Sequence, residues 1–228
     1  MFEDGTSLPQ IDTVFLATGY ELRIPFLSSI RNTSVSTPLP DPDDCDALTN
    51  NGRYLRPLFR HVFSLAPTHA PRALAFIGLP IFIEVGISDL AQALLVAHAL
   101  ADPTLLPPTP ALLADLRAQE AAVDDPARTG HRIVPGGGAA YQDGLVAMLQ
   151  DRGLHGGSIP PRGTRFTEPW REFATRETGR LNLAWLEIEA RGEEEVRKWL
   201  GTVKRGDEAE WADLMVRVIE WYKEQGRD

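Results

Sequence analysis

Residues 11–20 read Ile11-Asp12-Thr13-Val14-Phe15-Leu16-Ala17-Thr18-Gly19-Tyr20, an apolar run that ends in a Thr-Gly pair. Such a run predicts a buried strand over residues 11–17 with a tight turn at its end. Gly19 has no Cβ, so the backbone there can adopt a positive φ or approach a ligand closely. Ligands of open α/β sheets gather beyond the carboxyl ends of strands. The stretch therefore predicts a strand and a ligand-accessible turn, without specifying the ligand.

A second apolar run has the same form. Residues 73–77 read Ala73-Leu74-Ala75-Phe76-Ile77 and are followed by Gly78-Leu79-Pro80, which predicts another short buried strand that ends in a turn. His61 lies in the segment that leads into this run, and we interpret it as a structural histidine, the commoner role of a lone histidine.

A helix is expected after this turn, ending near Asp102-Pro103. Ser88 can cap it, with Asp89 in the first turn, where a negative charge suits the helix dipole. Its apolar face is expected to comprise Ile87, Leu90, Ala91, Leu94, Ala97 and His98. Further helices are expected over residues 110–122 and 144–149, and between residues 183 and 222.

Four phrases of this sequence resemble the flavin-containing monooxygenase family. They are the Asp4-Gly5-Thr6 and Ala17-Thr18-Gly19-Tyr20 pair, the Leu58-Phe59-Arg60-His61-Val62-Phe63 segment, the Ala75-Phe76-Ile77-Gly78-Leu79 run, and the Val134-Pro135-Gly136 to Tyr141-Gln142-Asp143 region. The resemblance covers roughly residues 4–150 and corresponds to the C-terminal part of a full-length member. It implies a segment of a FAD-binding, Rossmann-like domain.

The resemblance also implies a chemistry and a set of site residues. Members of the family use NADPH to reduce FAD and transfer oxygen from a flavin hydroperoxide to nitrogen or sulfur of small nucleophilic substrates. The matching positions that would contact the cofactor are Thr18, Gly19, Tyr20, Gly78, Leu79, Pro80 and Gln92. The acid that the family places two residues before the glutamine is replaced by Leu90, so a core helix with Gln92 on the surface is an alternative. No catalytic side chain is assigned.

The glycine motifs for both dinucleotides are missing from the sequence. No G-x-G-x-x-G occurs, and at Gly136-Gly137-Gly138 the position of the third glycine is taken by Tyr141. As a family member the chain is thus truncated, and we expect it to bind FAD weakly or not at all by itself. The alternative is a non-catalytic product, acting as a helical interaction module or complementing a partner chain that carries the missing half.

The fold class expected is α/β, a partial FAD-binding sheet remnant with a mainly helical C-terminal half. Three regions are expected: residues 1–53 as the return link from an NADPH domain and a connection, 54–150 as the C-terminal part of a FAD-binding domain, and 151–228 as a linker and a helical extension.

Composition narrows the classes of partner and compartment. The net charge of −9 and pI near 5.1 argue against nucleic acid, whose phosphates an acidic chain repels. A lone cysteine, Cys45, fits a reducing compartment, and neither a signal peptide nor a membrane span is evident, so a cytoplasmic location is expected. The aspartates between residues 41 and 46 do not match a calcium loop. No metal-ligand spacing appears among the histidines.

Overall fold

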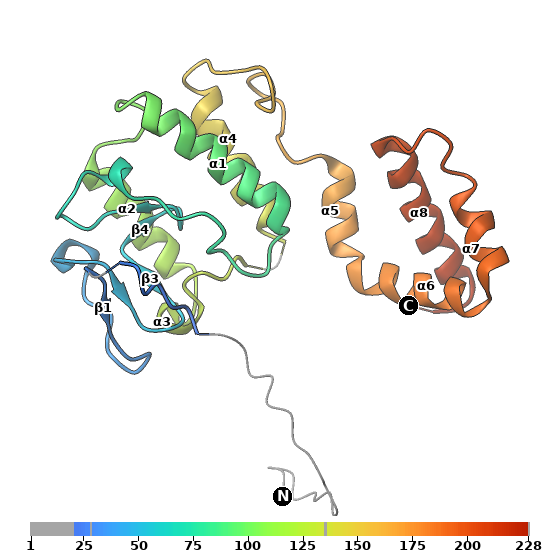
Figure 1. The fold of residues 1–228 in the computed structure, drawn as a ribbon, viewed down its shortest axis with the longest axis horizontal. Helices are drawn as coiled ribbons and strands as arrows, with labels where there is room; N and C mark the ends of the chain where they lie inside the picture. The colour runs from blue at the N-terminus through green and yellow to red at the C-terminus, as the bar shows by residue number, and fades with distance from the viewer. Residues whose placement is uncertain (1–20, 28, 135, 228) are drawn as a thin grey trace, which may run out of the picture.

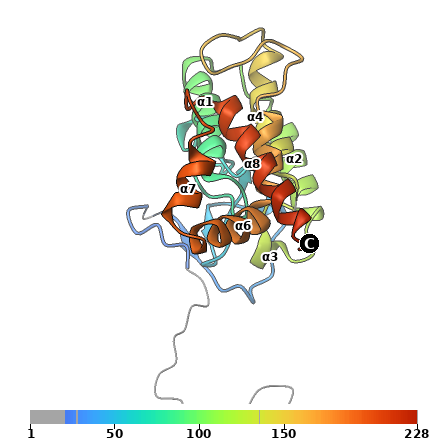
Figure 2. The same ribbon diagram turned by 90° about the vertical axis from the view of Figure 1, so that its right-hand side faces the viewer.

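A computed structural model of the chain describes residues 21–27, 29–134 and 136–227. These residues form two lobes, joined by a long loop over residues 151–168 (Figure 1). The first lobe holds the short strands and helices α1 to α4. The second lobe holds α5 to α8, which Figure 2 views face on.

The strands are short and form two small sheets. In the first, β1 (Arg31–Asn32) pairs in parallel with β2 (Thr49–Asn50), which pairs antiparallel with β3 (Leu55–Arg56). In the second, β4 (Leu58–Phe59) pairs antiparallel with β5 (Phe63–Ser64). The described part of the chain is therefore mixed α/β with a helical majority, and the strand expected over residues 11–17 lies outside it.

The prediction of a strand over residues 73–77 is wrong. A 3₁₀ helix covers Pro71–Ala73, and only Ala75 forms a bridge, antiparallel to Phe63 of β5. The neighbouring backbone bonds, from Ser64 N–H to Leu74 O and from Phe76 N–H to Val62 O, tie the segment to one partner on one side. A parallel ladder needs partner strands, and the described residues supply none here.

Helix α1 (Val85–Ala101) packs along α4 (Gly138–Gln150) and forms the centre of the first lobe. Its buried face comprises Ser88, Ala91, Gln92, Leu95 and Ala99. The expected face is wrong in part, because Leu90 is 39 % exposed and Ala97 is also exposed. Small residues at positions 91 and 99 allow the close approach of α4, whose Leu145 and Leu149 share the same core.

Two expected helix starts are also wrong. Helix α1 begins at Val85 after Glu84, which makes no side-chain cap, so Ser88 is no N-cap and Asp89 lies beyond the first turn. Helix α4 begins at Gly138 rather than at residue 144. In contrast, α2 (Thr109–Ala121) confirms the helix expected over residues 110–122, with Leu112 and Leu116 buried. The short α3 (Pro126–Thr129) follows it.

The second lobe consists of α5 (Pro169–Arg176), α6 (Thr178–Ala190), α7 (Glu193–Leu200) and α8 (Glu208–Glu224). The helices expected between residues 183 and 222 are confirmed, and on α8 Leu214, Val218 and Ile219 are buried, whereas Trp211 is 44 % exposed. Leu214 and Val218 share a small core with Ala184 and Ile188 of α6. Asp207 caps α8 by accepting a hydrogen bond from Glu210 N–H at 3.0 Å.

Candidate functional site

Of the two turns predicted to contact a cofactor, the structure describes the one at Gly78-Leu79-Pro80. Gly78 has φ +83°, a conformation that favours glycine, and lies at the surface, whereas Leu79 is half-buried and Pro80 is buried. The Gly78 N–H donates to Gln92 Oε1 over 2.8 Å. A Cβ at Gly78 would lie 3.5 Å from Asp89 Oδ1. The turn therefore rests against the N-terminal half of α1.

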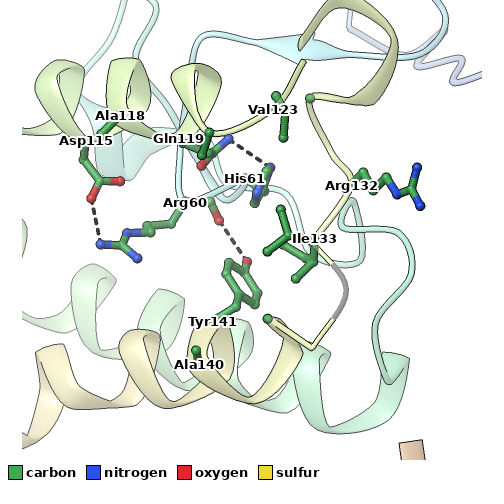
Figure 3. Close-up of a pocket in the computed structure, with 14 residues that line it drawn as sticks. Arg60, His61, Asp115, Ala118, Gln119, Val123, Arg132, Ile133, Ala140 and Tyr141 are labelled. Carbon is green, nitrogen blue, oxygen red and sulfur yellow. Dashed lines mark hydrogen bonds and ion pairs between the residues drawn. The ribbon is translucent and has the colours of Figure 1, made fainter. Parts of the chain in front are cut away.

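Gln92 links this turn to the core. Its side chain is fully buried, and its Nε2 donates to Tyr141 Oη over 2.7 Å. Tyr141 in turn donates to the backbone carbonyl of Arg60 over 2.9 Å, as Figure 3 shows. In this chain of hydrogen bonds each residue donates to the next, from Gly78 through Gln92 and Tyr141 to the Arg60 carbonyl. It fixes the turn relative to α4 and to the segment before β5.

The start of α1 is anchored by the Tyr141-Gln142-Asp143 phrase. Gln142 Nε2 donates to Glu84 Oε2 over 3.3 Å, and its Oε1 accepts from Thr167 Oγ1 over 2.9 Å. Asp143 Oδ1 accepts the N–H groups of Phe166 and Thr167. These side chains have structural roles, since they hold the interlobe loop onto the first lobe.

Large apolar side chains are exposed around the turn. The exposed fractions are 49 % for Ile77, 48 % for Ile81, 74 % for Phe82 and 63 % for Val85. Phe82 has φ +61°, and the Arg132 guanidinium lies 4.7 Å from its ring centroid. These four exposed apolar residues flank the turn, and we call this apolar surface the 77–85 ledge.

The predicted site residues are only partly brought together. Gly78 and Gln92 are in direct contact, whereas Thr18, Gly19 and Tyr20 lie outside the described residues. Gln92 is enclosed with both ends of its amide bonded to protein, so the alternative that placed it on the surface is wrong. Its role in the structure is to position the turn.

A buried ion pair that neither local sequence indicates joins β3 to α2. Arg56, 1 % exposed, donates through Nε and Nη2 to both carboxylate oxygens of Glu120, at 2.7 and 3.0 Å. Tyr54 Oη also donates to Glu120, at 3.0 Å. Burial and the adjacent Glu120 charge raise the pKa of Tyr54 well above its usual value, so it remains a neutral donor.

Cys45 lies beside this ion pair as a buried thiol. Its Sγ accepts from Arg56 Nη1 at 3.4 Å and lies 3.6 Å from the Asp41 carbonyl, to which it donates. Burial raises the pKa of the Cys45 thiol, which disfavours the thiolate form. The nearby aspartates bind arginines: Asp41 and Asp43 contact Arg117, and Asp46 contacts Arg31.

The described ranges contain no cluster of three or more His, Cys, Asp or Glu side chains that could hold a metal ion. Within these ranges, none of the helices is both long and apolar enough to cross a bilayer. No protein-family model matches the sequence, and comparisons with curated proteins and with solved structures find no significant match.

Proposed function

We propose that this chain supplies the C-terminal part of the FAD-binding domain of a flavin-dependent monooxygenase. The Gly78 turn and the first turns of α1 would form one wall of the flavin site. One observation carries this proposal: an exposed glycine turn is held against the start of a 17-residue helix by the enclosed amide of Gln92. A glycine turn at the surface lets backbone groups approach a ligand closely.

The charges at this wall suggest which part of FAD it would face. The carboxylates of Glu84 and Asp89 lie next to the turn and the helix start, and they would repel a diphosphate. The 77–85 ledge instead offers apolar surface, and the turn offers backbone groups. The wall therefore suits the uncharged isoalloxazine ring and ribityl chain, with backbone rather than side-chain contacts.

The rest of the flavin site would come from elsewhere. No G-x-G-x-x-G is present to bind a diphosphate, so under this proposal those loops would belong to an upstream segment. Bound FAD, reduced by NADPH, would supply the oxygen transfer to nitrogen or sulfur of small substrates. The residues of this chain would position the ring and exclude water from one side, and no catalytic side chain is assigned to them.

A FAD titration tests this proposal. The chain alone and a version extended upstream through the adjoining genomic sequence are titrated with FAD, and quenching of flavin fluorescence is measured. We expect little or no binding by the chain alone and saturable binding by the extended chain. A genomic sequence that encodes no dinucleotide-binding glycine motif upstream, or an extended chain that does not bind FAD, would contradict the proposal.

A second candidate function, a helical interaction module, is favoured by the second lobe. A groove of about 290 Å³ between α6 and α8 is lined by Leu181, Trp185, Leu214 and Val218, among others. Leu183, Leu186 and Trp211 remain 56 %, 60 % and 44 % exposed. A gene whose promoter and start directly precede Met1, with no glycine motif upstream, would favour this function over the flavin enzyme.

A further inference from the structure

A pocket lies on the first lobe, and its lining does not include the Gly78 turn. It has a volume of about 410 Å³ and lies between α2, the start of α4, the 130–134 segment and the Arg60-His61 turn (Figure 3). This size falls in the range of small-molecule sites, roughly 300–1,000 Å³. His61 lies in the middle of this group, between Gln119 and Ile133.

Hydrogen bonds assign the proton positions of two facing histidines. Leu55 N–H donates to His131 Nε2 over 3.0 Å, so this nitrogen is an acceptor and the proton of neutral His131 is on Nδ1. His131 Nδ1 lies 3.2 Å from His61 Nδ1 and donates to it. Gln119 Nε2 donates to the same His61 nitrogen over 3.3 Å. The proton of His61 must therefore be on Nε2.

This Nε2–H donor of His61 is open to the pocket. The residue is only 3 % exposed, and Nε2 has no hydrogen-bond partner among the described residues. Unlike Arg60 Nε, which is unpartnered and fully buried, His61 Nε2 retains some solvent-accessible surface. Because His61 lines the pocket, this accessible edge of the ring faces the pocket. A buried donor without an acceptor is costly unless a ligand or water satisfies it.

The backbone at Arg60 and His61 has positive φ angles. Arg60 and His61 have φ of 51° and 59°, in the left-handed region that residues other than glycine seldom adopt. The hydrogen bond from Tyr141 to the Arg60 carbonyl helps to hold this turn, and so does the bond from His131 to His61. Backbone of this kind occurs often at ligand sites.

The charge and the walls of the pocket indicate the class of ligand. The charged lining residues are Arg60, Asp115 and Arg132; the Arg132 side chain points away from His61 (Figure 3) and its guanidinium lies over the Phe82 ring, so Arg60 is the cation that remains at the pocket. Asp115 takes one bond from Arg60 Nη2, at 2.7 Å, while Arg60 Nε remains unpartnered. The remaining wall is apolar, from Val123, Ile133 and the methyl groups of alanines in α2 and α4.

We propose that this pocket binds a small carboxylate with an apolar tail. One carboxylate oxygen accepts the His61 Nε2–H, the Arg60 guanidinium supplies the favourable charge, and the tail lies against Ile133 and Val123. This proposal does not rest on the proposed flavin function.

Hexanoate is the probe, with 1-hexanol as its uncharged counterpart. Long-range ¹H–¹⁵N spectra of the full chain, labelled at histidine, follow the His61 imidazole at pH 7.5 during titration. We expect a saturable shift of the Nε2 resonance with hexanoate, and at least tenfold weaker binding of hexanol. The absence of a saturable shift, or equal binding of the two compounds, would overturn the proposal.

Two variants make the test specific. The His61→Asn variant retains an acceptor near the Nδ1 position but lacks the Nε2–H. Its affinity for hexanoate, measured by calorimetry, should be at least tenfold weaker. Ala140→Leu places a larger side chain at the pocket wall from an exposed helical position and should also weaken binding at least tenfold. His155→Asn and Ala101→Leu, both at exposed positions away from the pocket, are the controls. A folded Ala140→Leu variant that binds like the original chain would overturn the proposal, even if His61→Asn failed to fold.

Discussion

The Nδ1 atoms of His61 and His131 lie 3.2 Å apart, and both residues are 3 % exposed. His131 Nδ1 carries the hydrogen of this bond, so His61 cannot be protonated on Nδ1 without losing it. Burial, with the nearby Arg60 charge, lowers the pKa of His61 to about 4, and burial with the neighbouring His61 lowers that of His131. The pair joins the Arg60-His61 turn to the 130–134 segment in its neutral form.

Stability should therefore depend on pH. Unfolded histidines titrate near 6.5, so the unfolded chain binds more protons than the folded chain between about pH 6.5 and 4. The contribution of the pair is complete above pH 6.5 and is lost as the pH falls toward 4. For His61 the change is on the order of 3 kcal/mol, given its pKa of about 4. Urea unfolding of the first lobe, measured between pH 7.5 and 4.5, checks this.

His61→Asn provides the comparison for that measurement, because it removes one of the two titrating groups. Its stability should fall less steeply than that of the original chain over the same pH range. Parallel pH profiles for the two proteins would show that the loss of stability comes from other groups.

Gln92→Leu should destabilise the first lobe. The substitution leaves Gly78 N–H without its acceptor and Tyr141 Oη without a donor. Loss of a hydrogen bond at the buried Tyr141 hydroxyl costs about 1–3 kcal/mol. Urea midpoints measure the change, and Gln225→Leu at an exposed helix end is the control, expected to remain within about 0.5 kcal/mol. Equal midpoints for the two variants would mean that Gln92 does not hold the turn.

The Arg56–Glu120 pair should tolerate double replacement better than single replacement. Glu120→Leu alone leaves the buried Arg56 guanidinium unpaired, which costs about 3–5 kcal/mol. Arg56→Met combined with Glu120→Leu removes both charges and should recover a large part of that loss. A double variant as unstable as the sum of the two single variants would contradict this coupling.

The second lobe should depend on its own small core. Ile188→Ala removes a fully buried side chain of α6 and should cost about 2–5 kcal/mol. Leu183→Ala, on the same helix but 56 % exposed, should change stability little. Hydrogen exchange resolved by segment measures both, and loss of protection should concentrate in α6 to α8. Equal protection in the two variants would contradict the assignment of this core.

The sequence predicts the helices better than the strands, for a physical reason. Periodicity along α2 and α8 is local information, so both could be predicted, although the start of α1 depends on tertiary contacts rather than on a cap. The 73–77 strand depends on partners that its own residues do not encode. Only Ala75 finds one, and the apolar composition of the run alone could not show this.

The candidate site was predictable only in part. Gly78 stands out because a glycine after an apolar run predicts a turn, and its contact with Gln92 spans 14 positions along the sequence. His61 and His131 are 70 positions apart, and nothing in either local sequence indicates that they meet. Tyr141 is a polar aromatic at the start of a helix, and its bonds to Gln92 and Arg60 depend on how α4 packs.

The most direct test of the proposed flavin site compares two glycine substitutions in the upstream-extended chain. Gly78→Val and Gly153→Val introduce a side chain at similar positive φ, +83° and +77°, but only the first lies at the proposed wall. We predict that Gly78→Val raises the dissociation constant for FAD at least tenfold, about 1.4 kcal/mol, while Gly153→Val leaves it unchanged. Equal FAD affinity for the two variants would contradict a flavin site at this turn.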